Sequence, residues 1–99
     1  MTSVIRYSPS ARNDLGDIAE YLEREASAKI AKAILSRIRR HVKTLERDAL
    51  RYRERRELGE GRRAHLIGPD IAFYRGDSEA VLILRILHAS RDIKSKLLD

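Results

Sequence analysis

Cationic side chains gather in the second half of this 99-residue sequence, beside segments that are expected to form a sheet. The cations are Arg62, Arg63, Arg85, His88 and Arg91, and Tyr74 lies among them as a side chain that could transfer a proton. Guanidinium groups bind phosphates and stabilise charge that develops on them, whereas an imidazole or a phenol can transfer a proton. The set therefore allows two functions, the binding of an anionic target or the cleavage of a phosphodiester bond.

Arg85 lies within the apolar run 80–87, between Leu84 and Ile86. A guanidinium buried in a strand needs a partner, because an unpaired charge is costly to remove from water. Two arrangements would satisfy it. Arg85 either forms an ion pair with Asp92 or a similar acid, or it opens onto a groove where a ligand supplies the negative charge.

Several other chemistries have no support in the sequence. The chain contains no cysteine, which excludes disulfides, thiolate metal sites and cysteine nucleophiles. His41, His65 and His88 have no second ligand at a spacing that fixes a metal site. No glycine loop matches a phosphate-binding motif, and no serine lies in a nucleophile-elbow setting. We therefore expect neither a metal nor a cofactor.

Length and hydropathy set the class of protein. Ninety-nine residues with 42% hydrophobic and 36% charged side chains are typical of one small globular domain, which we expect to span 1–99. The longest unbroken apolar run is 80–84, whereas a membrane-spanning helix needs about 20 apolar residues. The first residues have no signal-peptide pattern. A cytoplasmic protein is the expectation.

The positive charge is concentrated in one window. The chain has 21 basic and 15 acidic residues, a net charge of +6, and the window 37–63 holds 11 of the basic and 5 of the acidic ones. The window 37–63 alone therefore carries the whole net charge of the chain. The segment 11–26 has the opposite character, since its acidic residues outnumber its basic ones. A basic band of this kind attracts phosphates or an acidic protein segment, although a solvated helix face with local ion pairs is the alternative.

The first half of the chain predicts a strand followed by two helices. Residues 4–7 are rich in strand formers, and Ser8 and Pro9 are typical of a helix start. Apolar residues then recur at helical spacing from 11 to 26. Ser27 can cap a second helix whose apolar stripe runs from 30 to 45. The short break between the two predicts an antiparallel hairpin.

The second half predicts three strands. Residues 48–61 lose helical periodicity and indicate a frayed helix end with a basic loop, and 93–98 could form a final helical turn. The expected strands are 64–67, 71–74 and 80–87. The last is continuously apolar and β-branched, so it should be central and covered on both faces. The predicted class is α+β, in the order β-α-α-β-β-β, with the helical hairpin packed on a small, mostly antiparallel sheet.

Four segments in this order resemble the ParE branch of the ParE/RelE toxin superfamily. They are Tyr7-Ser8-Pro9-Ser10-Ala11 with Asp14-Leu15, Ile18 and Tyr21; Arg56-Glu57-Leu58-Gly59 with Arg62-Arg63; Ile71-Ala72-Phe73-Tyr74; and Arg85-Ile86-Leu87-His88-Ala89-Ser90-Arg91-Asp92. The last is the most specific, because it is similar to the family's closing strand with its His-x-x-Arg-Asp ending. The chain departs from the family after the second helix, where the frequent proline and glycine are missing.

The resemblance implies a toxin of a type II toxin–antitoxin system that a ParD-like antitoxin holds inactive in a hetero-oligomer. Such an antitoxin has a DNA-binding ribbon-helix-helix part and a flexible segment that wraps the toxin. The charge and hydropathy of the chain agree with such a partner. An acidic amphipathic segment would be attracted to the basic band and could bury its apolar side chains on the helical hairpin. The expected antitoxin contacts are Tyr21, Arg37, Arg40, Arg51 and Arg56.

Two targets follow from the resemblance. ParE members are implied to poison DNA gyrase, and here Arg62, Arg63, Tyr74, Arg85, His88 and Arg91 would bind the target. RelE members are implied to cut mRNA on the ribosome, with Arg62, Tyr74, Arg85, His88 and Arg91 as the catalytic set. The missing terminal tyrosine, which the nuclease branch often carries, favours gyrase. A basic nucleic-acid-binding domain without toxicity is a third interpretation.

Overall fold

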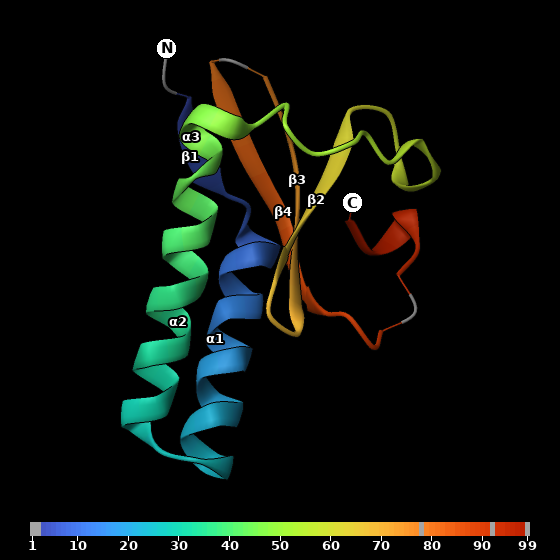
Figure 1. Ribbon diagram of the computed structural model, residues 1–99. Helices are drawn as coiled ribbons and strands as arrows, with labels where there is room; N and C mark the ends of the chain where they lie inside the picture. The colour runs from blue at the N-terminus through green and yellow to red at the C-terminus, as the bar shows by residue number, and fades with distance from the viewer. Residues whose placement is uncertain (1–2, 78, 92, 99) are drawn as a thin grey trace.

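The computed structural model describes residues 3–77, 79–91 and 93–98 and places two antiparallel helices against one four-stranded sheet (Figure 1). In chain order the elements are β1 (Val4–Tyr7), α1 (Pro9–Glu25), α2 (Ala28–Lys43), α3 (Leu45–Asp48), a 3-10 turn (Arg56–Leu58), β2 (Arg62–Ile67), β3 (Asp70–Gly76), β4 (Ala80–His88) and a last 3-10 turn (Ser95–Leu98). The predicted α+β class and its β-α-α-β-β-β order are confirmed.

The sheet has the strand order β1-β4-β3-β2, so the continuously apolar β4 is interior as predicted. β1 is parallel to β4, and the other two pairs are antiparallel. β1 pairs only with the first half of β4, up to Ile83, which leaves Arg85 beyond the end of its neighbour. The register between β3 and β4 shifts there as well, because Tyr74 lies opposite Ile83 while Phe73 lies opposite Arg85.

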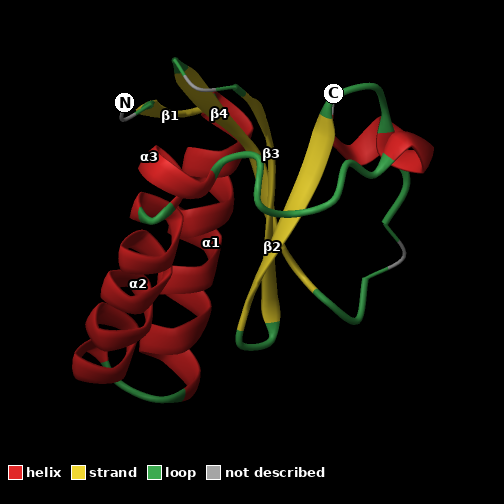
Figure 2. Cartoon of the chain, turned by 45° about the horizontal axis from the view of Figure 1, so that its top comes forward, coloured by secondary structure: helices red, strands yellow, loops and turns green. Residues whose placement is uncertain are grey.

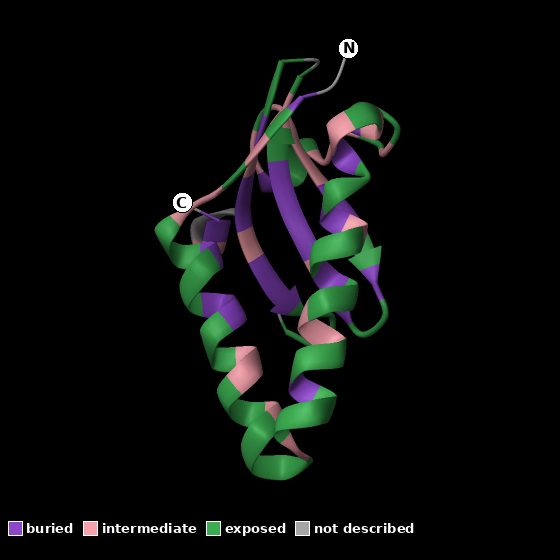
Figure 3. Ribbon diagram, turned by 90° about the vertical axis from the view of Figure 1, so that its left-hand side faces the viewer, coloured by how far each residue is buried: buried purple, intermediate pink, exposed green. Residues whose placement is uncertain are grey.

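Both faces of β4 are covered, as its sequence predicts. One core lies between the helical hairpin and the sheet and includes Leu15, Ile38, Val42, Ile83 and Ile86. A second core covers the other face, where Leu58, Phe73, Leu84, Leu87 and Leu98 pack together. Figure 2 shows the helical hairpin on one side of the strands and the C-terminal turn on the other. Figure 3 views the molecule from the hairpin side and shows the buried strand residues between α1 and α2.

Serine caps begin both long helices. The Ser27 Oγ accepts a hydrogen bond from the Ile30 amide at 3.1 Å. The Ser8 Oγ accepts one from the Ala11 amide at 3.0 Å and donates to the Leu84 carbonyl at 2.8 Å. The start of α1 is therefore fixed to the central strand, which determines where the next turns of the helix lie relative to β4.

The segment between α2 and β2 is more ordered than the expected frayed loop. Leu45 and Ala49 are buried and hold the short helix α3 against the first core. A single bridge then pairs Glu54 with Arg63 before the 3-10 turn. β2 begins two residues earlier than the sequence predicted, since Arg62 and Arg63 pair along β3. The missing proline and glycine are thus replaced by a short helix.

Candidate functional site

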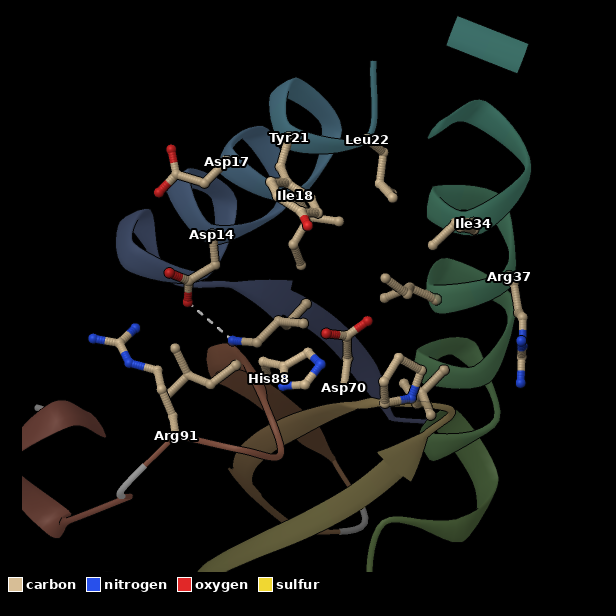
Figure 4. Close-up of a pocket in the computed structure, with 15 residues that line it drawn as sticks. Asp14, Asp17, Ile18, Tyr21, Leu22, Ile34, Arg37, Asp70, His88 and Arg91 are labelled. Carbon is tan, nitrogen blue, oxygen red and sulfur yellow. Dashed lines mark hydrogen bonds between the residues drawn. The ribbon is translucent and has the colours of Figure 1, made fainter. Parts of the chain in front are cut away.

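A groove of about 370 Å³ opens at the end of the sheet, between the two long helices and the turn that joins β2 to β3 (Figure 4). Its apolar walls are formed by Ile18, Tyr21, Leu22, Ile34, Ile38, Ile67, Pro69, Ile86 and Leu87. Its charged side chains are Asp14, Asp17, Arg37, Asp70, His88 and Arg91. An apolar trough with charges at its margins suits an amphipathic peptide better than a small polar substrate.

The charges are arranged along the groove. Figure 4 shows Arg91 and Arg37 on opposite sides of the drawn residues, with His88 and Asp70 between them. Asp70 and His88 face each other as register partners on β3 and β4. Burial raises the pKa of the Asp70 carboxyl, and the nearby His88 partly offsets this. A partner in the groove would therefore meet cations at both ends and the Asp70 carboxyl group near the middle.

Arg85 forms an ion pair with Asp14, the buried acid in the second turn of α1. Its Nε and Nη2 donate to the two carboxylate oxygens at 2.7 and 2.8 Å, and Nη1 donates to the Leu97 carbonyl at 2.8 Å. The Asp14 carboxylate also accepts from the Ile86 amide at 3.0 Å. The hydrogen bonds to Asp14 raise the pKa of Arg85. Arg85 thereby joins helix, central strand and C-terminal segment.

This geometry decides between the two arrangements that the sequence left open. The Arg85 side chain is only 19% exposed and its donors are used within the protein, so it does not open onto a groove as a free cation. The carboxylate partner is Asp14, while Asp92 lies outside the described residues. Arg85 therefore has a structural role in this fold, and its contact with a target stays a prediction.

Tyr74 is also a structural residue. Its side chain is fully buried on the helix side of β3, and its hydroxyl donates to the Ala49 carbonyl at 2.6 Å. Burial raises the pKa of the phenol to about 12. In this structure the phenol is buried and hydrogen-bonded within the protein, so Tyr74 has a structural role. Its role in target binding or cleavage stays a prediction.

Arg62 and Arg63 hold the loop before β2. The Arg62 Nη1 donates to the Leu58 carbonyl at 2.7 Å, and the Arg63 Nη1 donates to the Tyr52 carbonyl at 2.5 Å. Both side chains are half-buried. Capping backbone carbonyls in this way fixes the path of the loop, so these arginines contribute less to an open cationic rim than the sequence suggested.

His88 and Arg91 are the two predicted target residues that are exposed at the groove. The His88 Nδ1 lies 2.7 Å from the Ser90 Oγ and accepts from the Ser90 amide at 3.1 Å. Nδ1 is thus an acceptor, and in the neutral ring the proton is on Nε2. The Arg91 amide donates to the His88 carbonyl at 3.1 Å, which forms the turn that presents both side chains.

The residues expected to contact an antitoxin lie in three places. Tyr21, whose side chain is a large exposed hydrophobic group, and Arg37 line the groove. Arg40 is exposed elsewhere on α2. Arg51 forms an ion pair with Asp48 at 3.9 Å, and Arg56 forms one with Glu54 at 3.1 Å, both on the segment that leads to β2. The structure therefore brings two of the five together.

Sequence reasoning missed the groove itself. Asp17, Ile18 and Tyr21 recur at the spacing that places side chains on one face of a helix, and this was the available signal. Pro69 and Asp70 lie in a turn that was identified only as a connection between strands. Their meeting with α1 depends on how the hairpin packs across the sheet, which local patterns do not specify.

Neither a metal centre nor a membrane segment is found in the described part of the chain. Within residues 3–77, 79–91 and 93–98, no three metal-ligating side chains come together. The His41 and His65 rings approach to 5.8 Å between centroids, without a third ligand among the described residues. No described helix is both long and apolar enough to cross a bilayer.

Comparison with known proteins identifies the family. The model for the ParE toxin of the type II toxin–antitoxin system parDE matches residues 5–93. The chain belongs to this ParE toxin family. A comparison with curated protein sequences gives no significant match. The family assignment agrees with the resemblance that the four sequence segments carry.

Two solved structures share the ParE fold of this chain. One is described as the chromosomal ParDE toxin–antitoxin system from P. aeruginosa, with a TM-score of 0.77 and 22% identity, covering 88% of this chain and 96% of that one. The other is the toxin–antitoxin complex RelBE2 from Mycobacterium tuberculosis, with a TM-score of 0.66 and 26% identity, covering 92% and 95%. This chain is thus a ParE-family toxin of a type II toxin–antitoxin system. Its fold is shared by the ParDE and the RelBE2 structures.

Proposed function

We propose that this ParE-family toxin inhibits DNA gyrase by binding to it, without cleaving RNA. The observation that carries the proposal is the use of Tyr74 and Arg85 within the protein. The Tyr74 hydroxyl donates a hydrogen bond to the Ala49 carbonyl, and Arg85 is paired with Asp14. A nuclease needs a group that transfers a proton and cations that stabilise the negative charge of the transition state. Tyr74 does not supply the first and Arg85 does not supply the second, because both are bonded within the protein. His88 and Arg91 remain as exposed target contacts.

A supercoiling assay tests the target. Purified toxin is added to gyrase, ATP and relaxed plasmid, and both supercoiling and cleaved-complex formation are measured. We expect loss of supercoiling and accumulation of cleaved DNA, and Arg91→Ala should weaken both at least tenfold. Arg12→Ala is the matched control, because Arg12 is an exposed arginine on α1. Unchanged supercoiling with excess toxin would contradict gyrase as the target.

The groove supports the second part of the proposal, a ParD-like antitoxin that neutralises the toxin. A segment of the antitoxin would fold into a helix whose apolar side pairs with Ile18, Tyr21 and Ile34, while its acids face Arg37 and Arg91. Both solved neighbours are described as toxin–antitoxin systems or complexes. Opposite charge at the margins would speed association and fix the direction of the bound helix.

Binding of the toxin to its candidate antitoxin can be measured by calorimetry. Tyr21→Ala removes an exposed aromatic anchor and should weaken binding at least tenfold, as for other interface aromatics. Leu66→Ala is the control, because Leu66 is 66% exposed on β2 and does not appear in the groove lining. Equal affinities for the two variants would place the antitoxin elsewhere on the toxin.

Ribosome-dependent mRNA cleavage is the second candidate. It is favoured by the single turn that presents His88 and Arg91 together, and by the likeness to the RelBE2 complex. In this mechanism the His88 imidazole would transfer the proton and Arg91 would stabilise the developing phosphorane. Primer extension on mRNA from cells that express the toxin distinguishes the two. Cleavage that is lost in His88→Ala would support the nuclease and argue against gyrase.

A further inference from the structure

The outer side of α2 carries positive charge only. Residues 28–43 contain six lysines and arginines and no acid. Five of them are exposed and turned away from the core: Lys29, Lys32, Arg39, Arg40 and Lys43. At 3.6 residues per turn they fall within an arc of about 100° and extend over about 21 Å of helix. We call these five residues the α2 basic face, and none of them appears in the groove lining.

The charges of the α2 basic face are not neutralised by the described part of the protein. Among residues 3–77, 79–91 and 93–98, none of the five forms an ion pair. The acids closest along the chain are Glu25 and Glu46. Glu25 already pairs with Arg24 at 3.7 Å, and Glu46 is half-buried. Figure 1 shows α2 along the outer edge of the molecule, beside α1. An external partner can therefore reach the whole face.

We propose that the α2 basic face binds the phosphate backbone of duplex DNA. The inference goes beyond gyrase inhibition, since this face lies away from His88 and Arg91. A protein partner would need an apolar anchor, but the residues closest to the cations on this face are small, such as Ala33 and Ser36, and the exposed Ile30 lies about 80° outside their arc. The same absence of large apolar side chains disfavours insertion into a membrane surface.

The shape of the α2 basic face favours a DNA duplex over other nucleic acids. An exposed helix with small residues between its cations can approach the major groove of B-DNA, which is about 12 Å wide, and reach phosphates on both rims. The corresponding groove of duplex RNA is too deep and narrow for side chains. Single strands are held by stacking on aromatic rings, and the segment 28–43 contains no phenylalanine, tyrosine or tryptophan.

Fluorescence anisotropy with a labelled 20-base-pair duplex and the full-length toxin tests this proposal over a series of salt concentrations. If all five cations contact phosphates, log K falls against log salt with a slope of about −4.5. The triple variant Lys32→Gln, Arg40→Gln, Lys43→Gln should bind at least tenfold more weakly and reduce the slope by about 2.7. Circular dichroism and a thermal melt establish that the variant is folded.

The matched control removes the same charge elsewhere. Arg6→Gln, Arg12→Gln, Arg75→Gln also lowers the net charge by three, and all three arginines are exposed. This control should retain the wild-type slope. Equal losses in the two triples would overturn the proposal, because binding would then follow net charge alone. Equal or tighter binding of duplex RNA, single-stranded DNA or anionic vesicles would also overturn it.

Self-association is a further outcome to distinguish. The exposed side of α1 carries Asp17, Glu20 and Glu23, so the α2 basic face of one copy could bind α1 of another. Sedimentation velocity at low salt separates the two cases. A monomer that binds DNA supports the proposal, whereas a dimer that dissociates in the α2 triple variant and excludes DNA would overturn it. Both outcomes are independent of the supercoiling assay, so failure here leaves the gyrase proposal standing.

Discussion

The Asp14 carboxylate and the Arg85 guanidinium meet through two parallel hydrogen bonds of 2.7 and 2.8 Å, across 71 positions of sequence. The pair connects the second turn of α1 to the central strand, and through Leu97 it extends to the far side of the sheet. Arg85, for which the sequence left both a paired and a free arrangement open, therefore connects three parts of the tertiary structure.

Removing one partner of this pair should destabilise the fold strongly. Asp14→Ala leaves the Arg85 guanidinium and the Ile86 amide without their acceptor, and we expect a loss of about 3 kcal/mol in the free energy of unfolding. Urea denaturation measures it. The double variant Asp14→Leu, Arg85→Met should recover much of the loss, because no unpaired charge remains. A single-variant cost below about 1 kcal/mol would contradict the structural role.

Tyr74→Phe should affect stability and leave function intact. The variant removes the donor to the Ala49 carbonyl in the first core, and the unsatisfied carbonyl should cost about 1–2 kcal/mol. Growth inhibition at a temperature where the variant is folded should equal that of wild type. If toxicity disappears while the urea midpoint is unchanged, the buried phenol has a functional role that its environment does not explain.

His65 should make the fold sensitive to acid. Burial lowers its pKa below the ordinary 6.5, with smaller contributions from His41 and Arg51. The unfolded chain then binds a proton first as the pH falls, so stability is full above 6.5 and decreases below it towards the folded pKa. Urea midpoints from about pH 8 to pH 5 should fall more steeply for wild type than for His65→Gln. Parallel profiles would show that His65 does not contribute.

Alanine variants of Ile38 and Ile34, two isoleucines on α2, distinguish a loss of core packing from a loss of antitoxin binding. Ile38 is buried in the first core, and Ile38→Ala should cost about 2–5 kcal/mol of unfolding free energy. Ile34 is half-buried and lines the groove, so Ile34→Ala should cost less and should weaken antitoxin binding more. Denaturation and calorimetry on both variants check the ranking. The reverse order would mean that the groove is not the contact surface.

Arg91→Ala should reduce toxicity more than stability. The side chain is exposed in the turn after β4 and lacks an ion pair among the described residues. A change within about 0.5 kcal/mol in unfolding free energy is therefore expected, as for other surface positions. Plating efficiency under induced expression measures the toxicity. A destabilisation of several kcal/mol with toxicity retained would reverse this assignment.

The sequence predicted the elements well because their signals are local. The caps at Ser8 and Ser27, the helical spacing and the apolar run of β4 act within a few residues, and each is found in the structure. The order of the strands within the sheet, in contrast, was not predicted beyond the interior position of β4. Strand ends differed at β2, where pairing along β3 extends the strand beyond its local pattern.

The candidate site was predicted less well, since the partners of its polar groups are distant in sequence. Arg85 finds Asp14 71 positions away, and Tyr74 finds Ala49 25 positions away. Composition shows that the arginines are numerous, but it does not show which of them are paired. Exposed cations such as Arg37, Arg91 and those of the α2 basic face could be separated from the paired ones only in three dimensions.

The parallel pairing of β1 with β4 joins the first strand of the chain to the last. During synthesis the first strand therefore has no partner until residues 80–88 have emerged, although the helical hairpin can form earlier from local contacts. A translation product that stops before β4 would lack the strand on which both cores and the groove depend. We therefore expect such a product neither to fold nor to present the groove to a partner.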